Sequence, residues 1–225
     1  MNNVKEYLEV LLKKLPNNIR QKNGEVLGNL LAQYNPDYLE IYKDKIPDWY
    51  YVGLGLAEYN PEYLEKYKNQ IDDCRWIGQN LAKHNPEYLE IYKDNKIIRW
   101  DWVGDHLARY NPKYLELYKD KITDREWNWV GKHLAKYNPE YLELYKYKIT
   151  HWGVVGAWLA RNNPEYLEKY KDKIKDWDSV GWYLASHNAS YLVLYKDKID
   201  DWDRIKRRLV SNNPEYVERW EHKGA

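Results

Sequence analysis

The residues best suited to chemistry in this sequence are aromatic rings and imidazoles placed four positions apart. Trp102 and His106 form one such pair, and Trp129 and His133 form another. Residues four apart lie on the same side of a helix, so each pair would present two rings to one partner. Large amphipathic rings contribute strongly to binding at interfaces. The pattern therefore indicates a recognition surface.

We extend this prediction to a set of residues at equivalent positions along the chain. Each belongs to a column in which residue type changes from one repeat to the next, from Trp to Ser to Arg, which a packed core would not tolerate. The predicted partner-binding residues are Tyr51, Trp76, Trp102, His106, Trp129, His133, Trp158, Trp182, Tyr183 and Arg208. The alternative interpretation is that these rings fold sideways over neighbouring helices.

Motifs for catalysis and for cofactors are missing from the sequence. It contains no glycine-rich phosphate loop, no nucleophile elbow and no HExxH pair. His106 and His133 share a column and could bridge a metal, but no third ligand accompanies them. Cys74, the single cysteine, stands where other repeats have Trp and is expected in the core. We therefore predict a protein that is not an enzyme and has no cofactor, metal or disulfide.

A repeat positions all of these residues. The same Asn recurs at spacings of 25 to 27 residues, which is typical of stacked repeats. The repeated Asn residues are Asn35, Asn60, Asn85, Asn111, Asn138, Asn163, Asn188 and Asn213. The period predicts an all-α fold, an α-solenoid superhelix of about eight 25-residue two-helix repeats.

The repeat from Asn163 to His187 shows the expected pair of helices. Asn163 would cap the first helix and Pro164 would occupy its first position. Helical spacing places an apolar stripe on the first helix, formed by Tyr166, Leu167, Tyr170 and Ile174. A second stripe is formed by Trp177, Val180, Gly181 and Leu184. The glycine recurs in mid-helix, where it costs about 1 kcal/mol, and so predicts a close helix crossing.

The repeats also predict the organisation of the chain. Residues 1–34 are expected to form an N-terminal capping repeat, with a degenerate first helix at 4–15 and a longer connecting turn at 16–25. Residues 35–212 would form seven tandem repeats and residues 213–225 a C-terminal half-repeat, all in one continuous domain. On the first helices, Glu–Lys pairs such as Glu40 with Lys43 predict a solvated outer face.

On an ideal helix wheel, the variable columns of the second helix point about 140° to 240° away from the inward Trp. They therefore lie together, opposite the core, and form a strip that faces solvent. An exposed aromatic strip on a solenoid is typical of a recognition surface.

Part of the repeat resembles the leucine-rich-variant family. The shared features run from Val52 through Leu56 and Ala57 to Asn60, Pro61 and Leu64. The resemblance implies a right-handed superhelix of alternating α-helices and short 3₁₀-like helices. Tyr63 and Tyr67 depart from it because they replace aliphatic residues. A single cysteine also excludes an iron–sulfur cluster like that of one family member.

Charge and hydropathy limit the partner. The formal net charge is +1, so the whole chain has no strong field for nucleic acid or an anionic membrane, and no apolar run is long enough to span a bilayer. We therefore predict a cytoplasmic, non-enzymatic scaffold that binds a protein or peptide along the second helices. One alternative is a single-stranded nucleic-acid binder, in which Arg204, Lys206, Arg207 and Arg208 meet phosphate. Another is a designed or consensus array without a natural partner.

Overall fold

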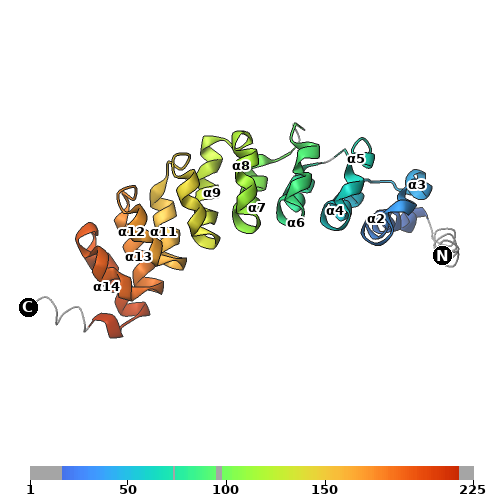
Figure 1. Ribbon diagram of the computed structural model, residues 1–225. Helices are drawn as coiled ribbons and strands as arrows, with labels where there is room; N and C mark the ends of the chain where they lie inside the picture. The colour runs from blue at the N-terminus through green and yellow to red at the C-terminus, as the bar shows by residue number, and fades with distance from the viewer. Residues whose placement is uncertain (1–16, 73, 95–97, 218–225) are drawn as a thin grey trace, which may run out of the picture. The chain divides into compact units, whose positions relative to one another are not determined.

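The computed structural model describes residues 17–72, 74–94 and 98–217, and these residues form helices and connecting turns without a β-strand (Figure 1). The chain groups into two compact units, residues 1–103 (unit 1) and 104–225 (unit 2). In each unit, long second helices lie along one edge and short first helices along the other. Each unit is thus an all-α solenoid of two-helix repeats, as the period predicts.

The described part of unit 1 starts with the long helix α2 and continues with two full repeats. Its elements are α2 (Asn17–Tyr34), η1 (Pro36–Tyr38), α3 (Leu39–Tyr42), η2 (Lys43–Lys45), α4 (Tyr50–Tyr59), η3 (Pro61–Tyr63), α5 (Leu64–Tyr67), α6 (Arg75–His84), η4 (Pro86–Tyr92) and the start of α7 (Trp100–Tyr110). The helices α2, α4 and α6 are the second helices of successive repeats.

Unit 2 holds the rest of α7 and the remaining repeats. Its elements are η5 (Pro112–Tyr114), α8 (Leu115–Tyr118), η6 (Lys119–Lys121), α9 (Asp124–Tyr137), η7 (Pro139–Tyr141), α10 (Leu142–Tyr145), α11 (Trp152–Asn162), η8 (Pro164–Tyr166), α12 (Leu167–Tyr170), α13 (Trp177–His187), η9 (Ala189–Lys198) and α14 (Trp202–Asn212). The second helices of this unit are α9, α11, α13 and α14.

The sequence prediction for residues 16–25 was wrong. Helix α2 extends from Asn17 to Tyr34, so it includes most of the stretch for which the sequence predicts a long connecting turn. The physical reason is that this stretch contains no Asn-Pro break: Pro16 precedes the helix, and Gly24 weakens a helix without ending it. The predicted degenerate first helix at 4–15 and the end of the predicted half-repeat, 218–225, lie outside the described residues.

The first helices are tighter than a regular α-helix. Each starts with a 3₁₀ turn, such as Pro164–Tyr166, and in most repeats continues as one α-helical turn, such as Leu167–Tyr170. The backbone N–H of Tyr166 donates to the carbonyl of Asn163 at 3.1 Å, the i to i+3 bond of a 3₁₀ turn. Leu167, Tyr170 and Ile174 are buried as predicted, whereas Tyr166 is only half-buried.

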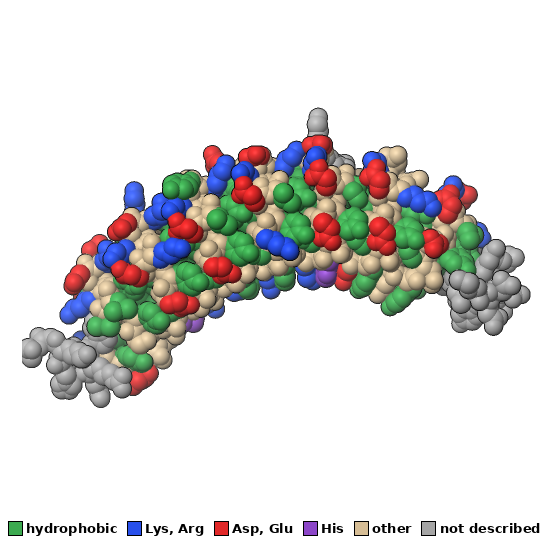
Figure 2. Space-filling model, in the orientation of Figure 1, with side chains coloured by type: hydrophobic (Ala, Val, Ile, Leu, Met, Phe, Trp, Pro, Cys, Tyr) green, Lys and Arg blue, Asp and Glu red, His purple; other side chains and the backbone are tan. Residues whose placement is uncertain are grey.

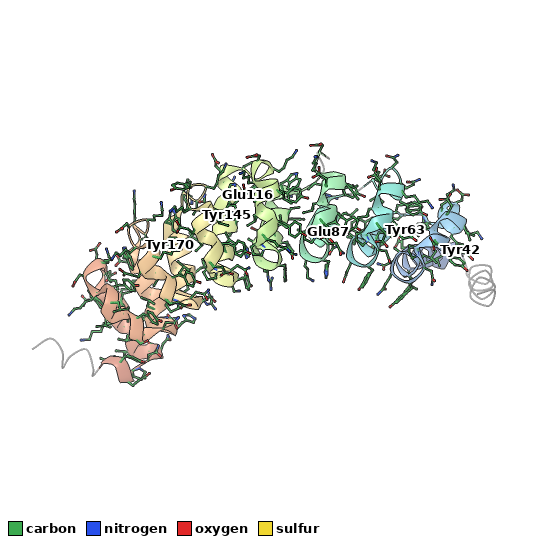
Figure 3. All side chains as sticks on the ribbon, in the orientation of Figure 1. Tyr42, Tyr63, Glu87, Glu116, Tyr145 and Tyr170 are labelled. Atoms are coloured by element: carbon green, nitrogen blue, oxygen red, sulfur yellow. The ribbon has the colours of Figure 1, made fainter. Side chains whose placement is uncertain are left out.

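The core is held by ring contacts between a second helix and the next first helix. Trp152 packs on Tyr170 with ring centroids 5.1 Å apart, and Trp127 and Trp177 pack in the same way on Tyr145 and Tyr195. Figure 3 labels Tyr145 and Tyr170. Cys74 replaces this Trp in unit 1 and is buried, which confirms its place in the core.

The repeated glycine marks the helix crossing, as predicted. A Cβ atom on Gly156 would lie 3.0 Å from side-chain carbons of Ile174 and Val180, which belong to the next repeat. Contacts this short are closer than packed carbon atoms normally approach. The glycine therefore lets the next repeat approach. Lys206 occupies this position in α14 and is exposed.

The repeated asparagine has a different role from the predicted helix cap. The Asn163 side chain makes no hydrogen bond to the helix that it precedes. Its Nδ2 atom instead donates to the carbonyls of Ala135 at 2.8 Å and Lys136 at 3.1 Å, at the C-terminus of the preceding repeat's second helix. Those carbonyls lack partners within their own helix. The following equivalent asparagines make similar bonds: Asn60, Asn85, Asn138, Asn188 and Asn213.

The short-helix edge carries the predicted Glu–Lys pairs. Glu40 and Lys43 lie 2.7 Å apart, and Figure 2 shows acidic and basic side chains interspersed over this edge. Leu144 and Leu194 are also exposed there, which the charge pattern did not predict. Among the described residues, no helix is both long and apolar enough to cross a membrane.

Candidate functional site

The second helices present a strip of side chains that face away from the core. Helix α9 shows why: Trp127 is fully buried, while Trp129, two positions and about 200° further round, is 54% exposed. Four positions of each second helix vary from repeat to repeat, and on α9 they are Trp129, Lys132, His133 and Lys136. We call these four columns on α9, α11, α13, α14 and the end of α7 in unit 2 the unit-2 strip. The same columns of α2, α4, α6 and the start of α7 form the unit-1 strip.

Cations lie over the tryptophan rings of the unit-2 strip. The Lys132 Nζ atom is 4.8 Å from the ring centroid of Trp129 on its own helix and 4.9 Å from that of Trp158 on α11. Lys136 and Arg161 also approach the Trp158 ring, at 5.3 and 5.5 Å. A cation over an aromatic face is attracted to the negative face of the ring, so these groups hold one another in place across neighbouring repeats.

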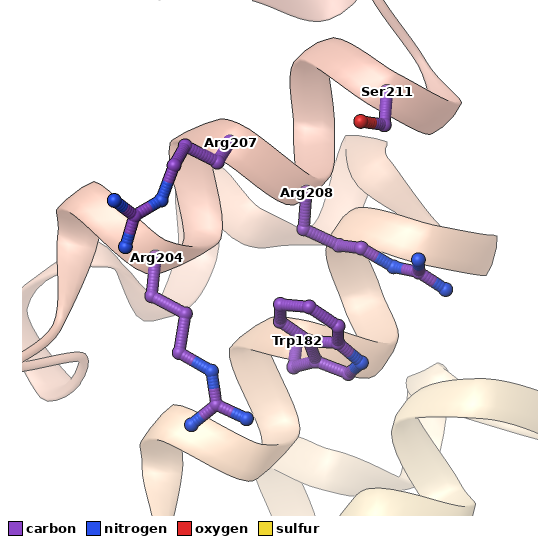
Figure 4. A pocket seen from close by; sticks show the side chains of 5 residues that line it. All are labelled: Trp182, Arg204, Arg207, Arg208 and Ser211. Atoms are coloured by element: carbon purple, nitrogen blue, oxygen red, sulfur yellow. The ribbon is translucent and has the colours of Figure 1, made fainter.

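A second cluster surrounds Trp182 near the end of the strip (Figure 4). The guanidinium carbons of Arg204 and Arg208 lie 4.8 and 4.7 Å from the Trp182 ring centroid. Arg208 Nε also donates to Ser186 Oγ at 2.6 Å. A pocket of about 390 Å³ is lined by Trp182, Arg204, Arg207, Arg208 and Ser211. The pocket therefore has an aromatic base and a cationic wall.

The charge of the unit-2 strip is one-sided. Its only carboxylate is Asp105, whereas its cations are Arg109, Lys132, Lys136, Arg161, Arg204, Arg207 and Arg208. In the described part of the chain, Arg204, Arg207 and Arg208 form no ion pair with a carboxylate. The acidic residues that neutralise the chain lie largely on the short helices and at helix starts. A net charge of +1 thus conceals a local positive surface.

His133 lies in this positive environment. Burial lowers the pKa of His133 to about 4, and nearby Lys132 and Arg109 add to the effect. Asp105 is 3.8 Å from His133 Nε2 and would favour the charged ring, but burial and the surrounding cations outweigh it. His133 is therefore neutral at pH 7. Its ring packs beside Tyr137, with centroids 6.2 Å apart.

His106 lies one repeat earlier and packs beside Tyr110, with centroids 5.9 Å apart. Its charge is one of the causes that lower the His133 pKa. Over residues 17–72, 74–94 and 98–217, no three His, Cys, Asp or Glu side chains are grouped as metal ligands would be.

The unit-1 strip has rings but almost no charge. Trp76 packs on Trp102 with centroids 4.6 Å apart, and Arg99 lies 4.5 Å from the Trp102 centroid. Trp76 is 41% exposed and Tyr51 is 37% exposed. Glu58 and Lys83 are the charged residues of its columns. This strip is thus mainly apolar.

The predicted residues divide between the units. Tyr51, Trp76 and Trp102 belong to unit 1, and the other seven belong to unit 2, where Trp158, Trp182 and Tyr183 are half-buried. None of the ten is buried. The alternative interpretation is partly correct, because Trp158 and Trp182 contact cationic side chains of neighbouring repeats.

Sequence reasoning missed two features of the strips. The first is a fifth column, just before each Asn, which contains the exposed Tyr34 and Tyr59. Its position at about 280° on the helix wheel would have placed it beside the strip. The second is Arg109, whose guanidinium lies 4.8 Å from the rings of both Tyr110 and Tyr137. The column pattern places Arg109 on the strip but does not show its contacts with these two rings.

No protein-family model, curated protein or solved structure matches the chain.

Proposed function

We propose that this protein is a non-enzymatic repeat scaffold that binds a protein or peptide along its second helices. The observation that carries the proposal is the exposed Trp129, which lies beside Lys132 on a strip with seven cations and one carboxylate. Aromatic residues and arginine are the side chains that contribute most to protein interfaces. The shared frame of buried Trp, closely packed Gly and half-buried Asn holds these side chains in fixed positions, which lowers the entropic cost of binding.

The ring contacts favour a peptide over single-stranded nucleic acid. A nucleic-acid base binds to such a surface by stacking on an open aromatic face. In unit 2, cations already lie over Trp129, Trp158 and Trp182. A base could stack only on a ring face that these cations leave open, so they reduce the aromatic area available for stacking. A peptide backbone and its side chains can bind without displacing them.

The proposal also includes a relation to leucine-rich-variant repeats and a cytoplasmic location. The 3₁₀ turn at the start of each short helix supports the relation to leucine-rich-variant repeats. A cytoplasmic location fits a chain whose single cysteine, Cys74, is buried. The scaffold acts by holding its partner, since the strip combines rings and cations without an arrangement of acid, base and nucleophile.

Selection from a phage-displayed library of random peptides tests the proposal. We expect the intact chain to enrich peptides whose affinity falls about tenfold in the Trp129→Ala, Trp158→Ala double variant, because interface tryptophans commonly contribute more than 1 kcal/mol each. Affinity is measured by fluorescence anisotropy and folding by circular dichroism. The single Trp129→Ala variant, which removes only an exposed ring, covers the case in which the double variant unfolds.

A matched control comes from the other edge of unit 2. Tyr147 is 83% exposed and Leu144 is also exposed, so the Tyr147→Ala, Leu144→Ala double variant removes a similar apolar area outside the strip. It should bind the selected peptides as the unmodified chain does. Failure to enrich any peptide, or equal loss of affinity in both double variants, would contradict the proposed function.

A further inference from the structure

The arginine cluster of the unit-2 strip indicates which kind of peptide is bound. Arg204, Arg207 and Arg208 line one pocket with Trp182, and no carboxylate of the described chain pairs with any of them (Figure 4). Like charges placed together repel one another and reduce folding stability. The chain nevertheless places three arginines within five residues of α14. A bound anion would remove this repulsion.

The stacking geometry leaves the arginines ready to bind an anion. The guanidinium groups of Arg204 and Arg208 both lie over Trp182. The N–H donors of a guanidinium lie in its own plane, so contact with a ring face leaves donors at its edge for a ligand. The Arg208–Ser186 hydrogen bond restricts that side chain further. Carboxylate accepts two parallel N–H bonds from such an edge. The cluster is therefore a preorganised receptor for carboxylate groups.

We propose that the partner segment bound by the unit-2 strip is acidic, and that two or more of its Asp or Glu carboxylates bind to Arg204, Arg207 and Arg208 around Trp182. This inference rests on the proposed function and specifies the class of peptide. Further cations lie on the preceding second helices, Arg161 on α11 and Lys132 and Lys136 on α9. An acidic segment that follows the strip would meet each of them in turn.

The repeat geometry also predicts the spacing of the acidic residues. Neighbouring helices pack about 8 to 10 Å apart. An extended peptide advances about 3.3 Å per residue, so about three residues span one repeat. We therefore expect the best ligand to be extended, with an acidic residue at about every third position.

The test uses the full chain and three fluorescein-labelled probes. The first is a peptide of about 12 residues with Glu at every third position and Ser or Gly between, a length that spans about four repeats. The second replaces each Glu with Gln, and the third is single-stranded oligo-dT of equal charge. We expect the Glu peptide to bind about tenfold more tightly than the Gln peptide, and to bind more weakly as salt is raised.

Two charge-matched variants locate the binding. The Arg204→Gln, Arg207→Gln, Arg208→Gln variant should bind the Glu peptide about tenfold more weakly, because it removes charge-assisted hydrogen bonds. The control is the Lys148→Gln, Lys175→Gln, Lys198→Gln variant. It removes the same charge from the segments that precede α11, α13 and α14, and it should change affinity less than about twofold. Circular dichroism checks that both are folded.

Several outcomes would overturn the inference. Equal affinity for the Glu and Gln peptides would show that carboxylates are not recognised. Equal weakening in both variants would show an effect of net charge alone. Tighter binding of oligo-dT than of the Glu peptide would identify a nucleic-acid surface. By contrast, selected peptides that lack Asp and Glu but depend on Trp129 would overturn this inference and leave the proposed function in place.

Discussion

The two units share one frame but carry different surfaces. Asn85 in unit 1 and Asn163 in unit 2 make the same pair of hydrogen bonds to the preceding repeat. In both units the mid-helix glycine allows side chains of the next repeat to pack closely. The strips differ: unit 1 has one cation and one carboxylate in its columns, whereas unit 2 has seven cations and one carboxylate. The two units therefore differ in charge at the strip positions, which lie outside the shared frame.

This difference separates the residues that specify the fold from those that specify the partner. In a repeat array each repeat contacts its neighbours, so frame positions are constrained on both sides. Most strip positions are exposed or half-buried, and they hold different residue types from one repeat to the next. Lys132 in unit 2 corresponds to Leu54 in unit 1, and His133 corresponds to Gly55 and Asn80. Exchanging residues between equivalent positions therefore tests the comparison directly.

The largest expected effect is the pH dependence that His133 gives to unit 2. Its folded-state pKa of about 4 lies below the unfolded value of 6.5, so the unfolded chain binds the proton in this range. The stabilising effect of the neutral ring is complete above pH 6.5 and is lost as the pH falls to 4. A shift of this size corresponds to up to about 3 kcal/mol.

His133→Asn, which introduces the residue of unit 1, should remove this dependence. Urea unfolding of both proteins at pH 7 and at pH 4.5 measures this dependence. The variant should lose less stability than the unmodified chain between these two values. An equal loss in both would show that His133 is not held neutral by its surroundings.

The shared frame leads to a second prediction, in which both units should respond alike. Asn163→Ala removes two hydrogen bonds, each with a net value of about 1 kcal/mol, so it should cost about 2 kcal/mol of unfolding free energy. Asn85→Ala should cost the same in unit 1. Chemical denaturation followed by circular dichroism measures both.

Asn162 supplies the control for this prediction. It directly precedes Asn163 but is exposed, and it bonds only to the Trp158 carbonyl of its own helix. Asn162→Ala should change stability by less than about 0.5 kcal/mol, as is usual for an exposed residue. If the two substitutions cost the same, the asparagine ladder does not hold the repeats together.

Periodicity predicted most of the fold because it reports which positions are constrained in every repeat. The buried Leu167 and Tyr170, the close approach at Gly156 and the exposed Trp129 all followed from spacing on a helix. The role of Asn163 did not, because its partners lie 27 and 28 residues earlier, and a local capping rule considers only the next turn. The helix at 16–25 was missed because the Asn-Pro signal is absent there.

The candidate site was harder to predict, because it depends on contacts between repeats. The columns identified exposed positions one helix at a time. They could not show that Lys132 on α9 reaches Trp158 on α11, or that Arg204 and Arg208 on α14 both reach Trp182 on α13. Side-chain length and the packing of adjacent repeats determine those contacts. A whole-chain charge of +1 also averaged over two edges with different charge.

The smallest expected effect tests whether charge is what distinguishes the two strips. Lys132→Leu gives unit 2 the side chain that unit 1 has at Leu54, and it removes the cation between Trp129 and Trp158. Affinity for the Glu peptide should fall about threefold, since an exposed cation contributes about 0.5 to 1 kcal/mol. Because one fewer charge takes part, the dependence of affinity on salt should also become shallower. Lys171→Leu removes a lysine that already pairs with Glu168 on the short-helix edge, and should change neither quantity. An unchanged salt dependence in Lys132→Leu would mean that apolar contact alone, as in unit 1, accounts for binding by the unit-2 strip.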